Sequence, residues 1–351
     1  MKDPRDRAIE NDAIDIGALL RGRPLRLDEI CARTGLTAAA AKDAIASAVE
    51  SGVSISRSGR YYLLSARNAP PAFMGGDLPV LVSDKDGRYR FGACGDAHLC
   101  SKYSRLDVLH ELYDIYAEEG LKTVYNTGNW IDGEASFNVH DLLVRGMDEQ
   151  LAYLAEHYPQ RKGITTYAVS GDDHEGWYAQ KFGVDIGRRA QQTMRDAGRK
   201  DWVNLGYMEA HIRLRHAKSG KESILAVVHP GGGSAYAISY TIQKLLESLE
   251  GGEKPAVALY GHYHKLMFAN IRNVWAIQTG TTKDQDPFMR KKRLAAHVGG
   301  CTVELRQDAA TGAITRCKVE LLRWFNRGFY NGRWSHAGAV TLTERALGGE
   351  D

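Results

Sequence analysis

The sequence predicts an α/β layered fold for residues 88–335, with a small helical domain at residues 1–66. Three observations lead to this prediction. Strand-like runs alternate with amphipathic helical runs along the main part of the chain. Clusters of His, Asp and Asn follow five of the strand-like runs. Residues 67–87 have the Pro-, Gly- and Asp-containing composition of a linker, and residues 336–351 are expected to form a C-terminal tail.

The overall composition is that of a globular protein. The chain has 351 residues, of which 43% are hydrophobic and 25% charged, and its length suggests two domains or one large domain with an appendage. The net charge of +3 does not by itself indicate nucleic acid. The odd number of cysteines, five, favours a reduced intracellular chain over a disulfide framework. Because we find neither a signal peptide nor a membrane-spanning apolar stretch, we expect a cytoplasmic protein with no membrane partner.

The N-terminal residues 1–66 predict three helices followed by a β-hairpin. Helices are expected at 13–20 and 27–34, and Thr37 is placed to cap a third, alanine-rich helix. The hairpin is expected within residues 53–64, around a Ser-Gly turn. This order of elements resembles a winged helix-turn-helix domain.

Two roles stay open for this N-terminal module: contact with DNA, or formation of a homodimer or docking of a protein partner. Residues 1–65 hold ten Lys and Arg and nine Asp and Glu, so the module is nearly neutral. Its third helix offers only Lys42 as a cation, where a DNA reader usually shows more polar and basic side chains. Arg57 and Arg60 in the hairpin are the candidates for contact with nucleic-acid phosphates.

In the main part of the chain, strands and helices follow one another in order. We expect strands at 88–93, 123–125, 165–169, 209–215, 223–228, 256–260, 273–278, 299–306 and 315–323. We expect helices at 106–119, 139–157, 178–197 and 235–250. In layered α/β folds, ligands bind beyond the carboxyl ends of the strands. The position of the polar clusters at strand ends is therefore stronger support for a site than any single cluster.

The polar clusters have the composition of a metal site. They contain Asp96, His98, Asn129, Asp132, Asp172, Asp173, His174, His229, His262 and His264. Carboxylate and imidazole groups are ligands for Mn, Fe, Zn and similar divalent ions. A lone histidine is more often a hydrogen-bonded surface or core residue, but Asp-x-His and His-x-His each place two donors on one loop. Two ions held by such a set can bind a phosphoryl oxygen and activate water.

On these motifs, residues 88–282 resemble the calcineurin-like metallophosphoesterase superfamily, which includes nucleases. The family's motifs run Asp-x-His, Gly-Asp-x-x-Asp, Gly-Asn-His-Asp/Glu, His and Gly-His-x-His, in this order. The resemblance implies a two-sheet β-sandwich flanked by helices. It also implies a centre of two divalent metal ions, with Mn expected and Fe, Zn, Mg or Ni as alternatives, and hydrolysis by a metal-bound hydroxide.

The resemblance further implies a role for each matched residue. Asn129 would bridge the two ions, and His174 would be the catalytic residue that assists the leaving oxygen. Asp132 would orient a histidine ligand, and Asp172 would support the ligands from outside the coordination sphere. The implied ligands are Asp96, His98 and His264 for one ion, and Asp173, His229 and His262 for the other.

Two positions depart from the family pattern. Asn129 stands in place of the bridging Asp, and Asp173 stands in place of an Asn, with Asp172 inserted before it. An amide is a neutral donor and bridges two cations less well than a carboxylate. Because the two changes are opposite in charge, we expect a compensated active site in which Asp173 supplies the carboxylate. The alternatives are a weakened second metal site, a binding-only relic, or a bridge formed by Asp132 or Asp172.

Three features favour nucleic acid as the substrate. They are the N-terminal module, an aromatic and basic segment at 323–334, and the basic run of Arg290, Lys291, Lys292 and Arg293. Alternatively, the basic run is a solvated loop and the segment a packed strand pair. We expect a phosphodiesterase that acts on DNA or RNA. The alternatives are a phosphatase or phosphodiesterase for nucleotides or small phosphate esters, and a non-catalytic DNA-binding or assembly protein with a degenerate metal site.

Overall fold

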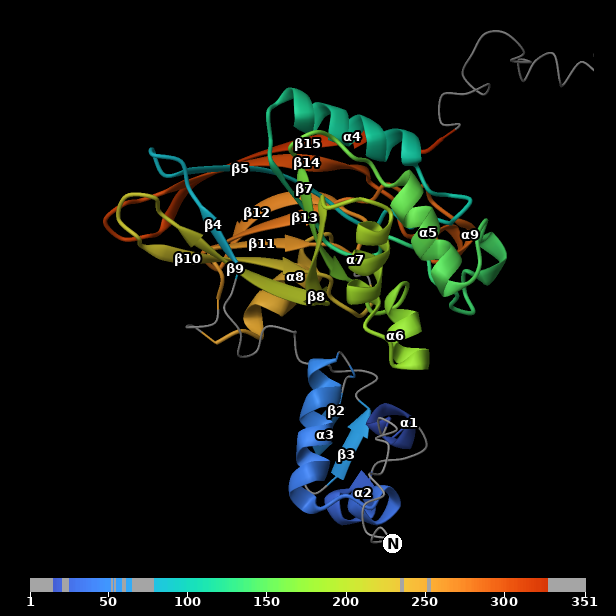
Figure 1. Cartoon of the computed structure of the whole chain (residues 1–351). Helices are drawn as coiled ribbons and strands as arrows, with labels where there is room; N and C mark the ends of the chain where they lie inside the picture. The colour runs from blue at the N-terminus through green and yellow to red at the C-terminus, as the bar shows by residue number, and fades with distance from the viewer. Residues whose placement is uncertain are drawn as a thin grey trace, which may run out of the picture.

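The main part of the molecule consists of two six-stranded sheets packed face to face, with helices on both outer sides (Figure 1). The computed structural model describes residues 15–20, 25–51, 53, 55–58, 61–64, 79–233, 237–250 and 254–327. Among the helices within these ranges, none has the length and apolar character needed to cross a membrane. The five cysteines all lie in this part of the chain and are free thiols.

One sheet carries the strands that lead to Asp96, Asn129 and Asp173. Its strands, in spatial order, are β15 (Ile314–Trp324), β14 (Val298–Gln307), β5 (Arg88–Cys94), β6 (Thr123–Asn126), β7 (Thr165–Ser170) and β8 (Trp202–Tyr207). Strands β5 to β8 run parallel, whereas β14 is antiparallel to both of its neighbours. Because parallel strands end at the same edge, the loops after β5, β6 and β7 lie together.

The other sheet carries the strands that lead to His229, His262 and His264. Its strands, in spatial order, are β12 (Leu266–Ile271), β13 (Val274–Thr279), β11 (Val257–Tyr260), β10 (Glu222–Val228), β9 (Glu209–Arg215) and β4 (Val80–Val82). Strands β10, β11 and β13 are parallel, and β9 and β12 are antiparallel to their inner neighbours. This sheet is therefore also mixed.

The main core lies between the two sheets. Phe91 and Tyr125 of the first sheet belong to one buried cluster with Leu225 and Val257 of the second. Full burial of a Phe or Leu side chain contributes roughly 1.5–3 kcal/mol. The rings of Phe91 and Tyr125 also pack edge to face, with centroids 5.2 Å apart. The expected two-sheet sandwich flanked by helices is confirmed.

Helices cover the outer faces of the two sheets. Leu109, Leu151 and Met194 contribute to a second core on the outer face of the first sheet, and Ile242 and Leu246 pack on the second sheet. The helices are α4 (Leu106–Glu118), α5 (Met147–His157), α6 (Gly176–Phe182), α7 (Ile186–Asp196), α8 (Tyr240–Glu247) and α9 (Pro287–Lys291), with a 3₁₀ turn η1 (Val139–Asp141).

The N-terminal elements follow the expected order of three helices and a hairpin. They are α1 (Ile16–Leu20), β1 (Leu25–Arg26), α2 (Leu27–Thr34), α3 (Ala38–Glu50), β2 (Ile55–Ser58) and β3 (Tyr61–Leu64). Thr37 caps α3 by accepting a hydrogen bond from the Ala40 amide, and Gly35 ends α2 with a φ of 72°. A small core forms around Ile30 and Ile45. Arg188 of α7 donates a hydrogen bond to the carbonyl of Glu50, at 2.7 Å.

Three predicted helices are shorter than expected, and the one expected at 235–250 is reduced to α8. The helix expected at 139–157 is reduced to η1 and α5, because the chain turns at Gly146, which has a φ of 89°. The helix expected at 178–197 is divided into α6 and α7. Gly183 ends α6 in the left-handed region, and the Asp185 side chain then caps α7.

The sheets also contain strands that the sequence did not predict. Strand β4 pairs with β9 although it lies inside the segment expected to be a linker, 67–87, so the sheet begins before residue 88. Its three residues are too few to give a periodic signal. Strands β8 and β12 and helix α9 were likewise missed. Residues 328–351, which include the expected tail at 336–351, lie outside the described residues.

Candidate metal centre

The loops after β5, β7, β10 and β11 bring His and Asp side chains into two groups. The first cluster is Asp96, His98 and His264, and the second cluster is Asp172, Asp173, His229 and His262. Within each cluster, one ligand atom from every residue lies within 4.8 Å of all the others. The loops that the sequence singled out therefore do meet at one place.

In the first cluster, three donor atoms face a common point. Oδ1 of Asp96 lies 3.3 Å from Nε2 of His264 and 3.9 Å from Nε2 of His98. The two imidazole nitrogens are 3.1 Å apart. All three side chains are buried. Burial raises the pKa of Asp96, but His264 and the other nearby imidazoles outweigh it and lower that pKa to about 2. The carboxylate is therefore ionised, as a metal ligand must be.

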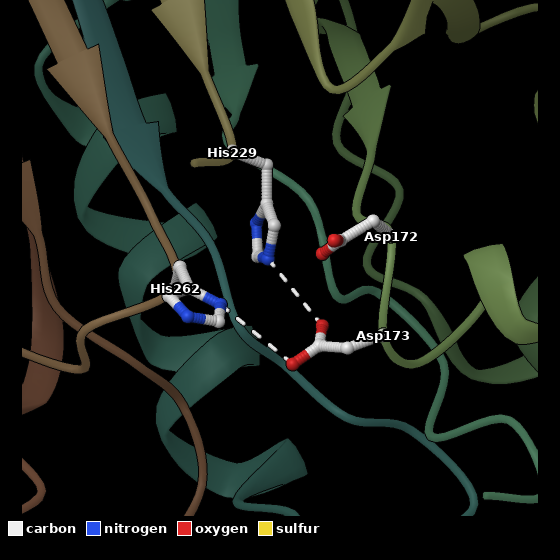
Figure 2. A group of neighbouring side chains, drawn as sticks. All are labelled: Asp172, Asp173, His229 and His262. Atoms are coloured by element: carbon white, nitrogen blue, oxygen red, sulfur yellow. Dashed lines mark ion pairs between the residues drawn. The ribbon is translucent and has the colours of Figure 1, made fainter. Parts of the chain in front are cut away.

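In the second cluster, Asp173 faces two histidines at once. Figure 2 shows its carboxylate between the rings of His229 and His262, with the carboxylate of Asp172 beside them. Oδ1 of Asp173 lies 3.8 Å from Nε2 of His229, and Oδ2 lies 3.7 Å from Nδ1 of His262. Asp172, expected outside the ligand set, thus lies within the cluster itself.

The second nitrogen of each histidine in this cluster is held by a backbone carbonyl. Nδ1 of His229 donates to the Thr127 carbonyl at 2.7 Å, and Nε2 of His262 donates to the Gly232 carbonyl at 2.6 Å. These bonds fix a hydrogen on one nitrogen of each ring and leave the other nitrogen facing Asp173. Such outer hydrogen bonds are typical of metal-binding histidines.

Several buried polar atoms in the centre have no hydrogen-bond partner among the described residues. They include Nε2 of His229, Nδ1 of His262, Oδ1 of Asn129 and Oδ1 of Asp172. A buried polar group without a partner costs about 1–3 kcal/mol. Four such atoms beside ionised carboxylates form a donor set that fits divalent cations, because cations would satisfy the lone pairs that the protein leaves unpaired.

Asn129 lies between the two clusters. Its Nδ2 is 3.4 Å from Oδ1 of Asp96 and 3.3 Å from Oδ1 of Asp173. This is the position expected of the bridging residue. The backbone amides of Asn129 and Gly171 both donate to Oε1 of Glu175, at 2.9 and 2.6 Å. Glu175, which the sequence did not single out as a site residue, therefore joins the two loops, and burial raises its pKa to about 7.

One oxygen of Asp132 contacts two histidines. Oδ1 lies 2.9 Å from Nδ1 of His98 and 3.1 Å from Nδ1 of His174. Lys283, which the sequence did not indicate, places its Nζ 3.6 Å from the same oxygen and 2.8 Å from Oδ2 of Asp286. Burial lowers the pKa of Lys283, but the two carboxylates outweigh burial and raise it. The buried ammonium thereby helps to keep Asp132 ionised.

His174 stands beside the two clusters with its ring fixed from one side. Its Nδ1 donates to the Asp132 carbonyl at 2.9 Å, and its ring packs edge to face on His98 and Phe137, with centroids 4.2 and 5.4 Å away. Burial lowers the pKa of His174, but Asp173 and Asp132 raise it more, to about 9. The two carboxylates therefore favour the protonated imidazole, the form that a proton donor needs.

The site residues also carry unusual backbone geometry. Five of the ten non-glycine residues with positive φ in the described part of the chain belong to this site: Asp96, His98, Asn129, His262 and His264. Their φ values lie between 46° and 70°. Such residues cost about 1–3 kcal/mol each and persist where the surrounding structure enforces them. The loops therefore hold the ligands at some cost in stability, which is typical of a functional site.

Two glycines allow the loops to approach one another. A Cβ at Gly171 would lie 2.1 Å from Oδ1 of Asn129, and a Cβ at Gly128 would lie 2.5 Å from Nδ1 of His229. Gly128 also has a φ of 99°, which disfavours other residues. Only glycine fits at either position without displacing a side chain of the centre.

The basic run lies near the centre. Phe288 of α9 packs on Phe137 with ring centroids 5.5 Å apart, and Phe137 in turn contacts His174. The four cations of this run follow Phe288 and are exposed: Arg290, Lys291, Lys292 and Arg293. None of them forms an ion pair with a residue in the described ranges, so they leave positive charge on the surface at the end of α9 and just after it.

The other residues expected to contact nucleic acid lie wholly or partly outside the described residues. The backbone of Arg57 lies in β2, but its side chain and the whole of Arg60 are outside the described residues. Of the segment 323–334, Arg323 and Trp324 end β15, and the part beyond residue 327 is also outside. These residues stay predictions.

No protein-family model and no curated protein matches the sequence. Solved structures match two thirds of the chain. An archaeal phosphodiesterase is 13% identical, with 67% of this chain and 100% of that chain covered and a TM-score of 0.33. A Streptococcus pneumoniae protein described as a predicted phosphoesterase is 13% identical, with 67% and 98% covered and a TM-score of 0.30. Vps29 of Entamoeba histolytica, solved with Zn²⁺, is 10% identical, with 66% and 99% covered and a TM-score of 0.30. At these values none of them assigns a role to a residue of this chain.

Proposed function

We propose that this chain is a divalent-metal-dependent phosphodiesterase that acts on DNA or RNA. The observation that carries the proposal is the pair of donor clusters with Asn129 between them. Each cluster combines carboxylate and imidazole donors, and in the second cluster Nε2 of His229 and Nδ1 of His262 face Asp173 without a hydrogen-bond partner among the described residues. This donor set suits Mn, Fe or Zn. We propose Mn as the native ion, with Fe, Zn, Mg and Ni as alternatives.

The first cluster would hold one ion and the second cluster the other. Two divalent cations, when bound there, supply the Lewis acidity that activates water and offsets charge on the phosphoryl oxygens. Asp132 keeps the ring of His98 in the orientation that presents Nε2 to the first cluster. The same carboxylate holds His174, which we propose donates a proton to the leaving oxygen. Lys283 stabilises the negative charge on Asp132.

Surface charge supports a nucleic-acid substrate. The exposed cations from Arg290 to Arg293 occupy the end of α9 and the two residues after it. Phe288 of the same helix packs on Phe137, which contacts His174. Cations in such a place bind backbone phosphates without regard to sequence. The order of the N-terminal elements also supports a winged-helix-like module, with Arg57 and Arg60 as phosphate contacts. A homodimer or a protein partner at this module is the alternative role.

One comparison tests the proposal. Turnover of bis(p-nitrophenyl) phosphate, p-nitrophenyl phosphate, and labelled single- and double-stranded DNA and RNA is measured with Mn²⁺ and with EDTA. We expect the diester and nucleic acid to be cleaved faster than the monoester, and only with metal. Faster turnover of the monoester would instead support a phosphatase for small esters. Binding of DNA without turnover under any metal would support a non-catalytic protein.

A pair of matched variants tests the nucleic-acid part separately. Arg290→Gln/Lys291→Gln removes two exposed cations beside the site, and Arg316→Gln/Lys318→Gln removes two exposed cations from β15. Because contacts to phosphates depend on salt, the Arg290→Gln/Lys291→Gln variant should cleave DNA more slowly than the wild type. Its cleavage rate should also change less with salt concentration. It should leave turnover of bis(p-nitrophenyl) phosphate unchanged. Equal effects of the two pairs on DNA cleavage would refute a specific role for the basic run.

A further inference from the structure

A depression opens beside the second cluster and is not used by the chemistry above. Its volume of about 650 Å³ falls within the range of small-molecule sites, about 300–1,000 Å³. Its walls include Phe137, Trp177, Gln180 and Tyr207, and it reaches the carboxylates of Asp172 and Asp173. A group bound in this depression is therefore adjacent to any phosphate held at the second cluster.

The walls of the depression are aromatic and partly exposed. Phe137 is 45% exposed although its ring contacts both His174 and Phe288. Trp177 and Tyr207 are half-buried, and Nζ of Lys181 lies over one face of Trp177, 4.3 Å from its ring centroid. Trp177 lies close to His174, since its backbone amide donates a hydrogen bond to the His174 carbonyl at 3.0 Å. Aromatic side chains that stay exposed in a hollow offer flat surfaces for stacking, and a planar aromatic group fits them.

The polar groups of the depression indicate which planar group it takes. Gln180 lies at its edge and donates to the Asp172 carbonyl at 2.5 Å, so the amide is held in place. Ser136 adds a hydroxyl. An amide and a hydroxyl can pair with the hydrogen-bonding edge of a base. The charged groups among the lining residues are the two carboxylates, which disfavour a second phosphate and favour a neutral group.

We propose that this depression binds the base of one nucleotide, stacked against Phe137 and Trp177, while the phosphate of that nucleotide lies at the second cluster. The proposal rests on the proposed function, because it needs a phosphate at the metal centre. The protein would thus bind the base of the nucleotide adjacent to the scissile phosphodiester bond. It also gives Phe137 a double role, since the same ring contacts the base and supports His174.

Calorimetric binding to the Mn²⁺-loaded full-length chain tests this proposal without requiring turnover. The two ligands are 2′-deoxyadenosine 5′-monophosphate and 2-deoxyribose 5-phosphate, in which a hydroxyl replaces the base at C1. We expect the nucleotide to bind at least tenfold more tightly to the wild-type protein. Phe137→Leu and Trp177→Leu should each reduce this ratio by about fivefold or more, toward equal affinities, because a stacked base contributes about 1–3 kcal/mol.

Two further variants serve as controls. Tyr240→Leu removes a ring that is 50% exposed but does not line the depression, and it should leave the ratio unchanged. Trp177→Phe keeps a ring at that position and should retain most of the ratio. Thermal unfolding of each variant shows whether the fold is intact. We expect it to be intact in Phe137→Leu and Trp177→Leu, because both rings are partly exposed.

The outcomes separate this proposal from the proposed function. Equal affinities of the wild type for the two ligands would overturn the proposal, and so would phenyl phosphate binding as tightly as the nucleotide. If diesters are hydrolysed without any preference for a base, only this proposal fails. If binding depends on the base but no phosphodiester is hydrolysed, the depression is a nucleotide site and the proposed function fails.

Discussion

The side-chain nitrogen of Asn129 lies 3.3 Å from a carboxylate oxygen of Asp173. The same nitrogen is 3.4 Å from Asp96, so a neutral amide stands between carboxylates of the two clusters. With an Asp at position 129, three carboxylates would lie together and repel one another in the absence of cations. The arrangement therefore supports a centre in which Asp173, and not residue 129, supplies negative charge to the second cluster.

Asn129→Asp should keep or increase activity. A carboxylate bridges two cations better than an amide does, so kcat/KM for a diester at saturating Mn²⁺ should equal or exceed that of the wild type. Without metal, the third carboxylate should destabilise the protein by about 0.5–3 kcal/mol. Steady-state kinetics and thermal melts with and without EDTA measure both effects. A tenfold loss of activity would show that the amide itself is required.

Asp173→Asn should reduce kcat/KM by at least about 100-fold, since it removes the carboxylate that faces both His229 and His262. The matched variant is Asp172→Asn, which removes a neighbouring carboxylate from the same cluster. Its effect should be smaller, within about tenfold. Wild-type activity in Asp173→Asn, or a larger loss in Asp172→Asn, would mean that Asp172 is the ligand instead.

Asp132→Asn should weaken metal binding, because one oxygen of Asp132 orients both His98 and His174. Loss of such an outer contact typically costs about 10–100-fold in metal affinity or activity. Asp286→Asn is the control, since Asp286 also pairs with Lys283 but has no hydrogen bond to a histidine among the described residues. The Mn²⁺ affinities of Asp132→Asn and Asp286→Asn are measured by calorimetry and compared. An equal loss in both variants would indicate a general effect on the buried charges.

His174→Ala should lower kcat by about 10²–10⁴-fold while metal content stays at the wild-type level. Its pKa is about 9 without metal, and nearby cations would lower it. Because a proton donor must be protonated, the wild-type rate should fall as pH rises through a value at or below about 9. This decrease at high pH should be absent from the pH–rate profile of His174→Ala. Loss of metal from His174→Ala would make His174 a ligand and not the proton donor.

The sequence was informative where a motif is local and weak where partners are distant. Asp96 and His98, or His262 and His264, share one loop, so their spacing alone indicates a ligand pair. Lys283 gives no such signal, because its partner Asp132 belongs to a distant loop and only the folded chain brings them together. Glu175 occupies the last position of the third motif, but its hydrogen bonds to the amides of Asn129 and Gly171 are seen only in the folded chain.

Strand β12 shows why some elements were missed. It forms a tight hairpin with β13 through Arg272 and Asn273, both of which have positive φ. Hairpin turns of this kind are usually marked by Gly after Asn or Asp, and this one contains no glycine. The sequence therefore lacked the turn signal, although the strand beyond it, β13, was expected at nearly its true position.

The most direct test of the two-metal centre is the Mn content of the protein after saturation with Mn²⁺ and removal of free metal, measured by mass spectrometry. We expect two ions per chain in the wild type. His264→Ala in the first cluster and His262→Ala in the second should each retain one ion. A wild-type protein that holds one ion or none at saturation would contradict the two-metal centre.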